Sequence, residues 1–252
     1  MAQRKSRKSR KRRGGRRRPG FLYQFLSVLF ICVAMVAGCI VFFKVDTIQV
    51  EGAQKYTGDQ IMAASGISKG DNLFLVNKFN AISRMFKQLP YLDQIMIRRR
   101  LPDMLVITVT EAQPVAVIES NQAYWLMDQK GKLLEKKKED PGTCANIVGI
   151  EPLSPVQGSY LTLKQDSQRT YLLTLIELLS DKKLISHIKE INLSDAGATW
   201  LRYENRFTIK LDPNSDLNYK TEFLARVLEQ IQSNEKGSID LTADIAHFIP
   251  FS

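Results

Sequence analysis

The chain has 252 residues, of which 44% are hydrophobic and 25% are charged, a composition that excludes collagen-like and low-complexity proteins. Its formal net charge is +10, but eleven of the 36 Lys and Arg lie in residues 1–20. The other 25 basic residues are matched by 26 acidic ones, which excludes a polycation whose whole surface binds nucleic acid. Three cysteines, two of them inside an apolar run, exclude a disulfide scaffold.

The apolar run covers residues 21–43 and contains no charged residue. A helix of this length extends about 34 Å, slightly more than the hydrocarbon core of a bilayer. A cleavable signal peptide is the alternative interpretation, but its apolar core would be shorter and would end at small residues, which Val41–Lys44 does not provide. The sequence therefore predicts a single transmembrane helix.

The basic tail, residues 1–20, predicts the orientation of that helix. Lys and Arg accumulate on the cytoplasmic side of membrane-spanning segments, and here they precede the apolar run. We expect a cytoplasmic N-terminus that lies on anionic lipid, with everything after Lys44 on the other side of the membrane. The residues expected to fix this topology are Arg12, Arg13, Arg16, Arg17 and Arg18.

A small module over residues 44–113 has the predicted order strand, helix, helix, strand, strand. Thr57–Gln60 has the form of a capping box, and the helix that it opens is expected to close at Gly66. Two alternating strands follow a second helix that begins at Asn77. The side chains of this second helix that we expect to cover the sheet are Phe79, Ile82, Phe86 and Leu89.

Residues 114–252 predict a second domain, a mixed sheet with helices packed on it. Helices are expected over residues 170–179 and 219–232, and a hairpin over residues 200–211. A last strand over residues 239–248 is a candidate sheet edge. The predicted fold class is α+β, with one transmembrane helix, a small β-α-α-β-β domain and a larger mixed β-sheet domain.

Five short motifs occur in an order that resembles one family. They are Gly70–Phe74, Arg100–Pro102, Glu111–Ala116, Trp125–Asp128 and Ile239–Leu241. Together with the single apolar segment and the basic tail, this order is similar to that of FtsQ/DivIB, the bitopic bacterial cell-division proteins. In that family the small module is called a POTRA domain.

The resemblance implies a protein of the cell membrane and division septum that is not an enzyme. Members of the family recruit the bitopic proteins FtsB/DivIC and FtsL by adding a partner strand at the end of the second domain, and so help control the septal peptidoglycan synthase complex. The positions that match here are the candidate edge strand and its approach, with residues Ile239, Asp240, Leu241, Ala243, Ile245, His247 and Phe248.

No residue pattern predicts a catalytic, metal or cofactor site. His187 and His247 have no Cys, Asp or Glu at ligand spacing. The S-x-x-K pattern of acyl-enzymes occurs at Ser180–Lys183 and Ser186–Lys189, without the companion motifs of such sites. Two alternatives remain: a membrane-tethered nucleic-acid-binding protein that acts through its tail, and an envelope hydrolase or transferase. The tail has no aromatic residue for base stacking, so no nucleic-acid partner is expected.

Overall fold

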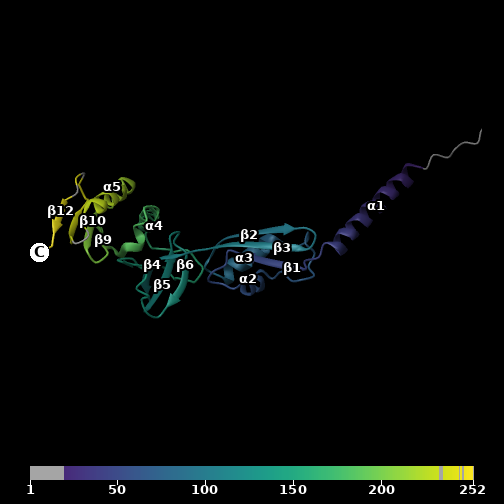
Figure 1. The fold of residues 1–252 in the computed structure, drawn as a ribbon, viewed down its shortest axis with the longest axis horizontal. Coiled ribbons are helices and arrows are strands. Elements are labelled where there is room, and N and C mark those ends of the chain that lie inside the picture. Colours follow the sequence, from purple (N-terminus) through teal and green to yellow (C-terminus); the bar gives the residue numbers. More distant parts are fainter. Residues whose placement is uncertain (1–19, 233–234, 244, 246, 252) are drawn as a thin grey trace, which may run out of the picture.

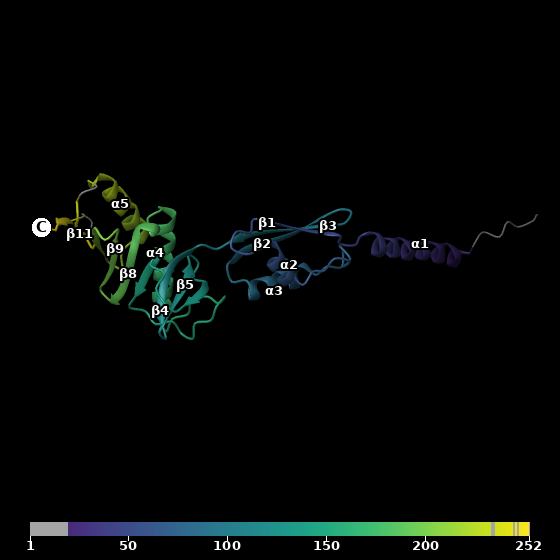
Figure 2. The same cartoon turned by 60° about the horizontal axis from the view of Figure 1, so that its bottom comes forward.

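The computed structural model describes residues 20–232, 235–243, 245 and 247–251. Three parts follow one another along the long axis: a separate helix, a domain built on three strands and a domain built on nine (Figures 1 and 2). The residues predicted to fix the membrane topology, Arg12, Arg13, Arg16, Arg17 and Arg18, lie outside the described residues.

Helix α1, Phe21–Phe42, forms where the apolar run predicts it. Within Leu22–Phe42, a window of 18 residues has a mean hydropathy of 2.8, and none of that window is buried against the rest of the protein. It is the one helix among the described residues that is long and apolar enough to cross a membrane. An apolar helix that no protein surface covers is suited to lipid rather than to water.

The three-stranded domain has the predicted order of elements. Thr57 and Gln60 form the predicted capping box, Gly66 ends the first helix with a φ of 66°, and the side chain of Asn77 caps the second. The central strand β3 is parallel to β1 and antiparallel to β2. The elements are β1 (Thr47–Glu51), α2 (Gly58–Ser65), α3 (Lys78–Gln88), β2 (Leu92–Arg100) and β3 (Met104–Glu111).

The face of α3 that covers the sheet differs in part from the predicted one. Ala81 and Met85 are the buried residues of this helix, and Leu89 follows them at the same four-residue spacing. Phe79, predicted to face the sheet, is 86% exposed, and Ile82 and Phe86 are only half-buried. The helix has two apolar stripes, and the one with the smaller side chains packs inward.

The nine-stranded domain is a mixed sheet in the order β12-β11-β10-β9-β8-β7-β4-β5-β6. The pairs β4–β7, β7–β8 and β10–β11 are parallel and the other pairs are antiparallel. Its elements are β4 (Pro114–Ser120), β5 (Ala123–Asp128), β6 (Leu133–Lys137), β7 (Ala145–Val148), α4 (Asp166–Asp181), the 3-10 turn η1 (Ile185–His187), β8 (Ile188–Asp195), β9 (Ala198–Tyr203), β10 (Phe207–Leu211), α5 (Leu217–Gln230), β11 (Gly237–Asp240) and β12 (His247–Pro250).

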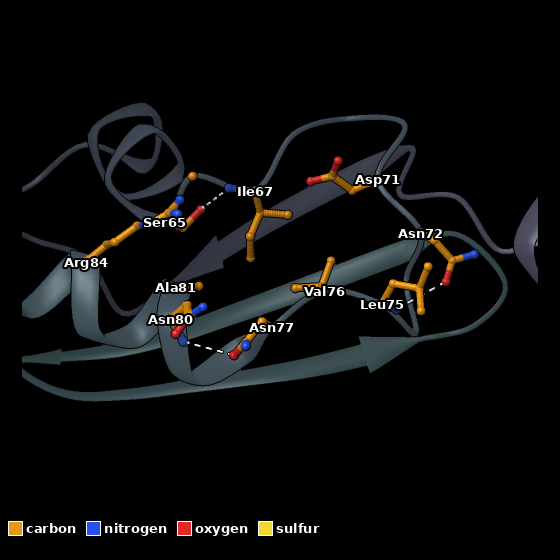
Figure 3. A pocket seen from close by; sticks show the side chains of 11 residues that line it. Ser65, Ile67, Asp71, Asn72, Leu75, Val76, Asn77, Asn80, Ala81 and Arg84 are labelled. Atoms are coloured by element: carbon orange, nitrogen blue, oxygen red, sulfur yellow. Dashed lines mark hydrogen bonds between the residues drawn. The ribbon is translucent and has the colours of Figure 1, made fainter.

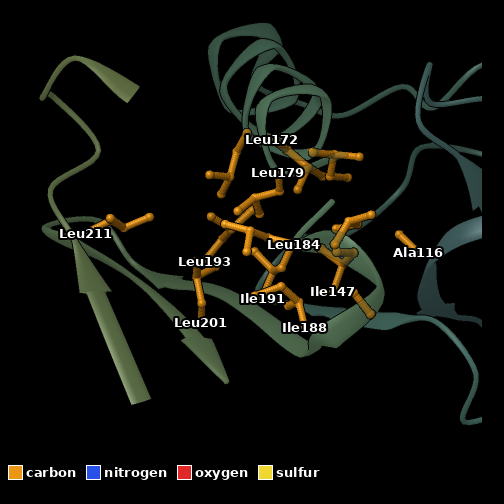
Figure 4. Packing of buried hydrophobic residues seen from close by; sticks show 14 of the residues in the cluster. Ala116, Ile147, Leu172, Leu179, Leu184, Ile188, Ile191, Leu193, Leu201 and Leu211 are labelled. Carbon is orange, nitrogen blue, oxygen red and sulfur yellow. The ribbon is translucent and has the colours of Figure 1, made fainter. Parts of the chain in front are cut away.

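One hydrophobic core holds the nine-stranded domain together. Figure 4 shows Leu172 and Leu179 of α4 pointing onto Ile191 and Leu193 of β8, and all four are buried. Leu224 of α5 extends the same core toward the last strands. With both domains described, the predicted α+β class is confirmed, including the two helices of this domain and the hairpin formed by β9 and β10.

The prediction of one continuous strand over residues 239–248 is wrong. The structure has two antiparallel strands here, β11 and β12, in a register that pairs Ile239 with Phe248 and Asp240 with His247. The chain leaves β11 after Asp240, whose carboxylate accepts hydrogen bonds from the backbone N–H and the hydroxyl of Thr242. This turn reverses the chain and breaks the alternation on which the prediction depended.

The two domains meet in a compact junction, because only Ala112 and Gln113 separate β3 from β4. Tyr91, Ala112 and Leu134 are buried together there. Lys132, which is 7% exposed, donates through Nζ to the Leu92 carbonyl at 2.9 Å. Burial lowers the pKa of Lys132, because charge is costly in a poorly hydrated site.

Glu135 joins the domains by polar contacts at the rim of the junction. Its carboxylate accepts the Tyr91 hydroxyl at 2.7 Å and the Lys55 ammonium at 3.0 Å. These hydrogen bonds, that of Tyr91 first, lower the pKa of Glu135 below its ordinary value of 4.5. Stability from a carboxylate with a lowered pKa is fully present above the ordinary value and is lost as the pH falls through the folded one.

We therefore expect Glu135→Gln to reduce the free energy of unfolding at neutral pH by about 1 kcal/mol, because the side chain is partly exposed. When the pH falls from about 7 to about 3, the free energy of unfolding should therefore decrease less in Glu135→Gln than in the parent protein. Urea unfolding at both pH values measures the effect, with the exposed Glu139→Gln as the matched control. An unchanged pH dependence in Glu135→Gln contradicts a role for this carboxylate.

Candidate functional site

The free edge of the nine-stranded sheet is the candidate site. Strand β12 has a single neighbour, β11, and forms one end of the sheet. The predicted partner-binding residues all belong to this hairpin. Ile239 and Asp240 lie on β11, Leu241, Ala243 and Ile245 lie in the connection, and His247 and Phe248 lie on β12.

The hairpin separates the predicted residues into a buried and an exposed group. Ile239 and Leu241 are fully buried in the core. The ring of Phe248 is half-buried and packs on Phe207, with 6.2 Å between ring centroids. As the structure stands, these three side chains point toward the core and away from a partner at the edge.

The exposed group is largely apolar. Ile245 is 69% exposed, and the structure adds two residues that the sequence analysis did not name, Ile249 at 62% and Phe251 at 56%. Ile249 follows from alternation once Phe248 is known to face inward. Large apolar side chains exposed beside an unpaired strand are typical of an interaction surface.

The backbone of β12 has few groups left for another strand. In an antiparallel ladder alternate residues bond to the neighbour, and Phe251 donates its N–H to the Lys236 carbonyl at 2.9 Å. The register then directs the backbone N–H and carbonyl groups of His247 and Ile249 toward β11. The groups that point away are the N–H and carbonyl of Phe248 and the carbonyl of Pro250, since proline has no N–H.

Helix α5 holds the connection between β11 and β12. Lys220 is 4% exposed, and its Nζ donates to the Ala243 carbonyl at 2.5 Å. A buried ammonium requires such a partner. The hydrogen bonds from Thr242 lower the pKa of Asp240, so this carboxylate stays charged in the turn. Ala243 therefore takes part in the site through its carbonyl group, which fixes the connection.

Arg206 holds the segment that leads into β11. Its guanidinium donates to the carbonyls of Gln232 and Glu235 and forms an ion pair with Glu204 at 3.2 Å. The same group lies 4.7 Å from the centroid of the Phe207 ring. One arginine thus connects the β9–β10 turn, the segment after α5 and the edge of the core.

Two of the residues considered for a catalytic role, His187 and Ser180, are occupied by structural contacts. His187 pairs with Glu204 at 2.7 Å and stacks on Tyr203. The Ser180 hydroxyl donates to the Ile176 carbonyl one helical turn earlier. Within the described part of the chain, no group of three or more His, Cys, Asp or Glu side chains is arranged to hold a metal ion.

Comparisons with known proteins agree with the fold and the motif order. The family "POTRA domain, FtsQ-type" matches residues 43–112, and "Cell division protein FtsQ/DivIB, C-terminal" matches residues 116–242. The chain belongs to the FtsQ/DivIB family. Its curated relatives are accordingly cell division proteins.

Two of these relatives cover most of the chain. The cell division protein DivIB of Clostridium acetobutylicum is 29% identical over 215 residues, which are 84% of this chain and 85% of that one. The cell division protein FtsQ of Syntrophotalea carbinolica is 29% identical over 220 residues, 84% of this chain and 76% of that one. The solved major extracytoplasmic domain of the trans isomer of DivIB from Geobacillus stearothermophilus aligns at 13% identity with a TM-score of 0.30, over 49% of this chain and 99% of that one.

The family match ends at residue 242, directly after β11. The later part of the connection and strand β12, which carry the exposed Ile245 and Ile249, lie beyond it. The match to this family model therefore includes β11, the strand that supports the edge, and ends before β12.

Gly237→Ala should detach the edge strand. A Cβ at this position would collide with the Ile249 carbonyl oxygen and the Phe248 ring. Overpacking of this kind costs about 1–3 kcal/mol. We expect faster hydrogen exchange of the His247 and Ile249 amides, which face β11.

Gly197→Ala is the matched control, because a Cβ there meets its nearest atom, Asp195 Oδ1, at an ordinary 3.5 Å. Exchange mass spectrometry of the C-terminal peptide measures both variants. Equal protection in the two variants contradicts the close approach of β12 to Gly237.

Proposed function

We propose that the protein is a non-enzymatic membrane scaffold of the bacterial division machinery. Its membership of the FtsQ/DivIB family supports a role in division. In this proposal α1 crosses the cell membrane with the N-terminus in the cytoplasm, and both folded domains lie outside, at the division septum. The chain divides into a tail (1–20), a membrane helix (21–43), a POTRA domain (44–113) and a partner-binding β domain (114–252).

The partner-binding part of the proposal depends on one observation: β12 is a sheet edge flanked by exposed Ile245, Ile249 and Phe251. A strand from an FtsB/DivIC-like protein, itself associated with an FtsL-like protein, would pair with the free backbone groups of Phe248 and Pro250. Exposed apolar side chains would then supply most of the contact area, because the backbone ladder is short. Through these partners the protein would act on the septal peptidoglycan synthase complex.

Ile249→Glu tests this surface, since it introduces a charge on an exposed side chain and leaves Phe248 in the core. We expect co-purification of the FtsB/DivIC-like and FtsL-like partners to fall about tenfold or more, the equivalent of about 1.4 kcal/mol. Leu153→Glu is the matched control, because Leu153 is 51% exposed and lies outside the hairpin. Equal partner recovery with both variants, each with the unfolding midpoint of the parent protein, rejects the edge as the docking site.

The location of fluorescent fusions tests the cellular role. We expect the full-length fusion to form a midcell band in dividing cells. A fusion truncated after Gly237 should still reach midcell but fail to support division, because it lacks most of β11 and all of β12. A uniform envelope signal from the full-length fusion, with normal division after depletion, counts against the septal assignment.

A further inference from the structure

The end of the three-stranded domain that adjoins α1 exposes several large apolar side chains. Phe74 is 47% exposed and Leu75 is 71% exposed in the segment between α2 and α3. Leu101, in the turn between β2 and β3, is 58% exposed. A soluble domain in contact only with water gains nothing from such side chains at one end.

The segment that carries Phe74 and Leu75 is bonded to the last turn of α1. The Asn72 side chain donates from Nδ2 to the carbonyls of Cys39 and Ile40, each at 3.1 Å. The Leu73 N–H donates to the Phe43 carbonyl at 2.8 Å. The Cys39 carbonyl also accepts the Phe43 N–H at 3.2 Å, as in a regular last turn. The carbonyls that follow it lie at the end of the helix, where main-chain partners run out, so the domain contributes to the C-terminal cap of α1.

Aromatic and basic side chains reinforce this attachment. Phe43 packs edge-to-face on Phe74, with 5.1 Å between ring centroids. Arg99 Nε donates to the Leu73 carbonyl at 2.6 Å, and the guanidinium lies 5.8 Å from the Phe74 ring. Figure 3 shows Asn72 and Leu75 together in this segment, where the Asn72 side-chain oxygen accepts the Leu75 N–H.

The turn between β2 and β3 lies at the same end of the domain. The Asp103 carbonyl accepts the N–H of Asp46 at 2.8 Å, and Asp46 is four residues beyond the end of α1. Arg98, Arg99 and Arg100 precede Leu101 and are exposed, as is Asp103 after it. The apolar tip of the turn is thus flanked mainly by arginines, whose long side chains reach phosphate groups from an apolar base.

The length of α1 indicates how deep in the bilayer its last turn, and the segment bonded to it, would lie. Its 22 residues extend about 33 Å, close to the thickness of the hydrocarbon core, so its last turn lies at the boundary with the headgroups. Because Asn72 is bonded to that last turn, Phe74 and Leu75 lie at the same boundary. Apolar side chains gain burial there without leaving the folded domain.

We propose that Phe74, Leu75 and Leu101 form a membrane-contact surface that enters the adjacent lipid leaflet, with Arg98 and Arg100 at the headgroup phosphates and Arg99 bonded within the domain. This inference rests on the proposed crossing of the membrane by α1. The surface gives the three-stranded domain a second attachment to the bilayer and fixes its tilt. The ligand is the lipid surface itself.

Leu75→Trp and Leu101→Trp report on this contact in the full-length protein, reconstituted in phosphatidylethanolamine–phosphatidylglycerol vesicles with brominated acyl chains. Bromine quenches tryptophan only at close range. The native Trp125 and Trp200 belong to the nine-stranded domain and give every variant the same background. Leu153→Trp, at a site that is 51% exposed in that domain, is the matched control.

We expect the fluorescence added at positions 75 and 101 to lose most of its intensity relative to unbrominated vesicles, with no loss at position 153. Flotation of the same vesicles tests the anchor separately. If the protein floats with the vesicles and the added fluorescence at 75 and 101 is quenched no more than at 153, the membrane-contact surface is rejected and the anchor stands. A protein that does not float rejects the anchor and this inference together.

Discussion

The ammonium of Lys132 is the contact on which the arrangement of the two sheets depends. It is buried at the junction, where the Leu92 carbonyl accepts its hydrogen bond, and the connection between the sheets is only Ala112 and Gln113. A short connection alone leaves the domains free to rotate about it. A buried charge with a specific partner restricts this freedom, because a large rotation would leave the ammonium without its hydrogen bond, and the Glu135 contacts with Tyr91 and Lys55 act in the same direction.

The two end strands of the nine-stranded sheet differ in how much of their backbone is already paired. Strand β6 is one end of that sheet, but the N–H and carbonyl of Leu133 on this strand already bond to Ser159 and Gly158 of a later loop. The Glu135 side chain on the same strand is engaged by Lys55 and Tyr91 of the smaller domain. Strand β12 lies at the opposite end, away from α1 and the smaller domain (Figures 1 and 2). The fold thus covers part of one edge with its own loop and leaves the other open, at the part of the molecule farthest from α1.

Local signals in the sequence predict much of the fold. The capping box at Thr57, the cap at Asn77 and the turn between β9 and β10 are each fixed by neighbouring residues, and all of them occur as predicted. The covering face of α3 is not local in this sense. Its two apolar stripes compete, and only the space above the sheet decides that Ala81 and Met85 pack inward. Strand β7 is not predicted from the sequence, because it has only four residues and pairs with strands that are distant in sequence.

The candidate edge was harder to predict, because alternation gives a strand two faces without indicating which one is buried. Ile239 and Leu241 are as apolar as Ile245 and Ile249, yet the first two are fully buried and the last two exposed. Their difference comes from the reversal after Asp240 and from the parallel pairing of β11 with β10. The sequence therefore predicts which segment lies at the sheet edge, and only its neighbours in the sheet determine which of its side chains face outward.

The cap that Asn72 places on α1 has a mechanical consequence. In the proposed arrangement α1 crosses the bilayer, Asn72 joins its last turn to the three-stranded domain, and Lys132 joins that domain to the next. The proposed binding edge would then be held at a set height above the lipid. A partner anchored in the same membrane would reach it only if its own extended segment ended at that height, so that length, as well as surface chemistry, would select the partner.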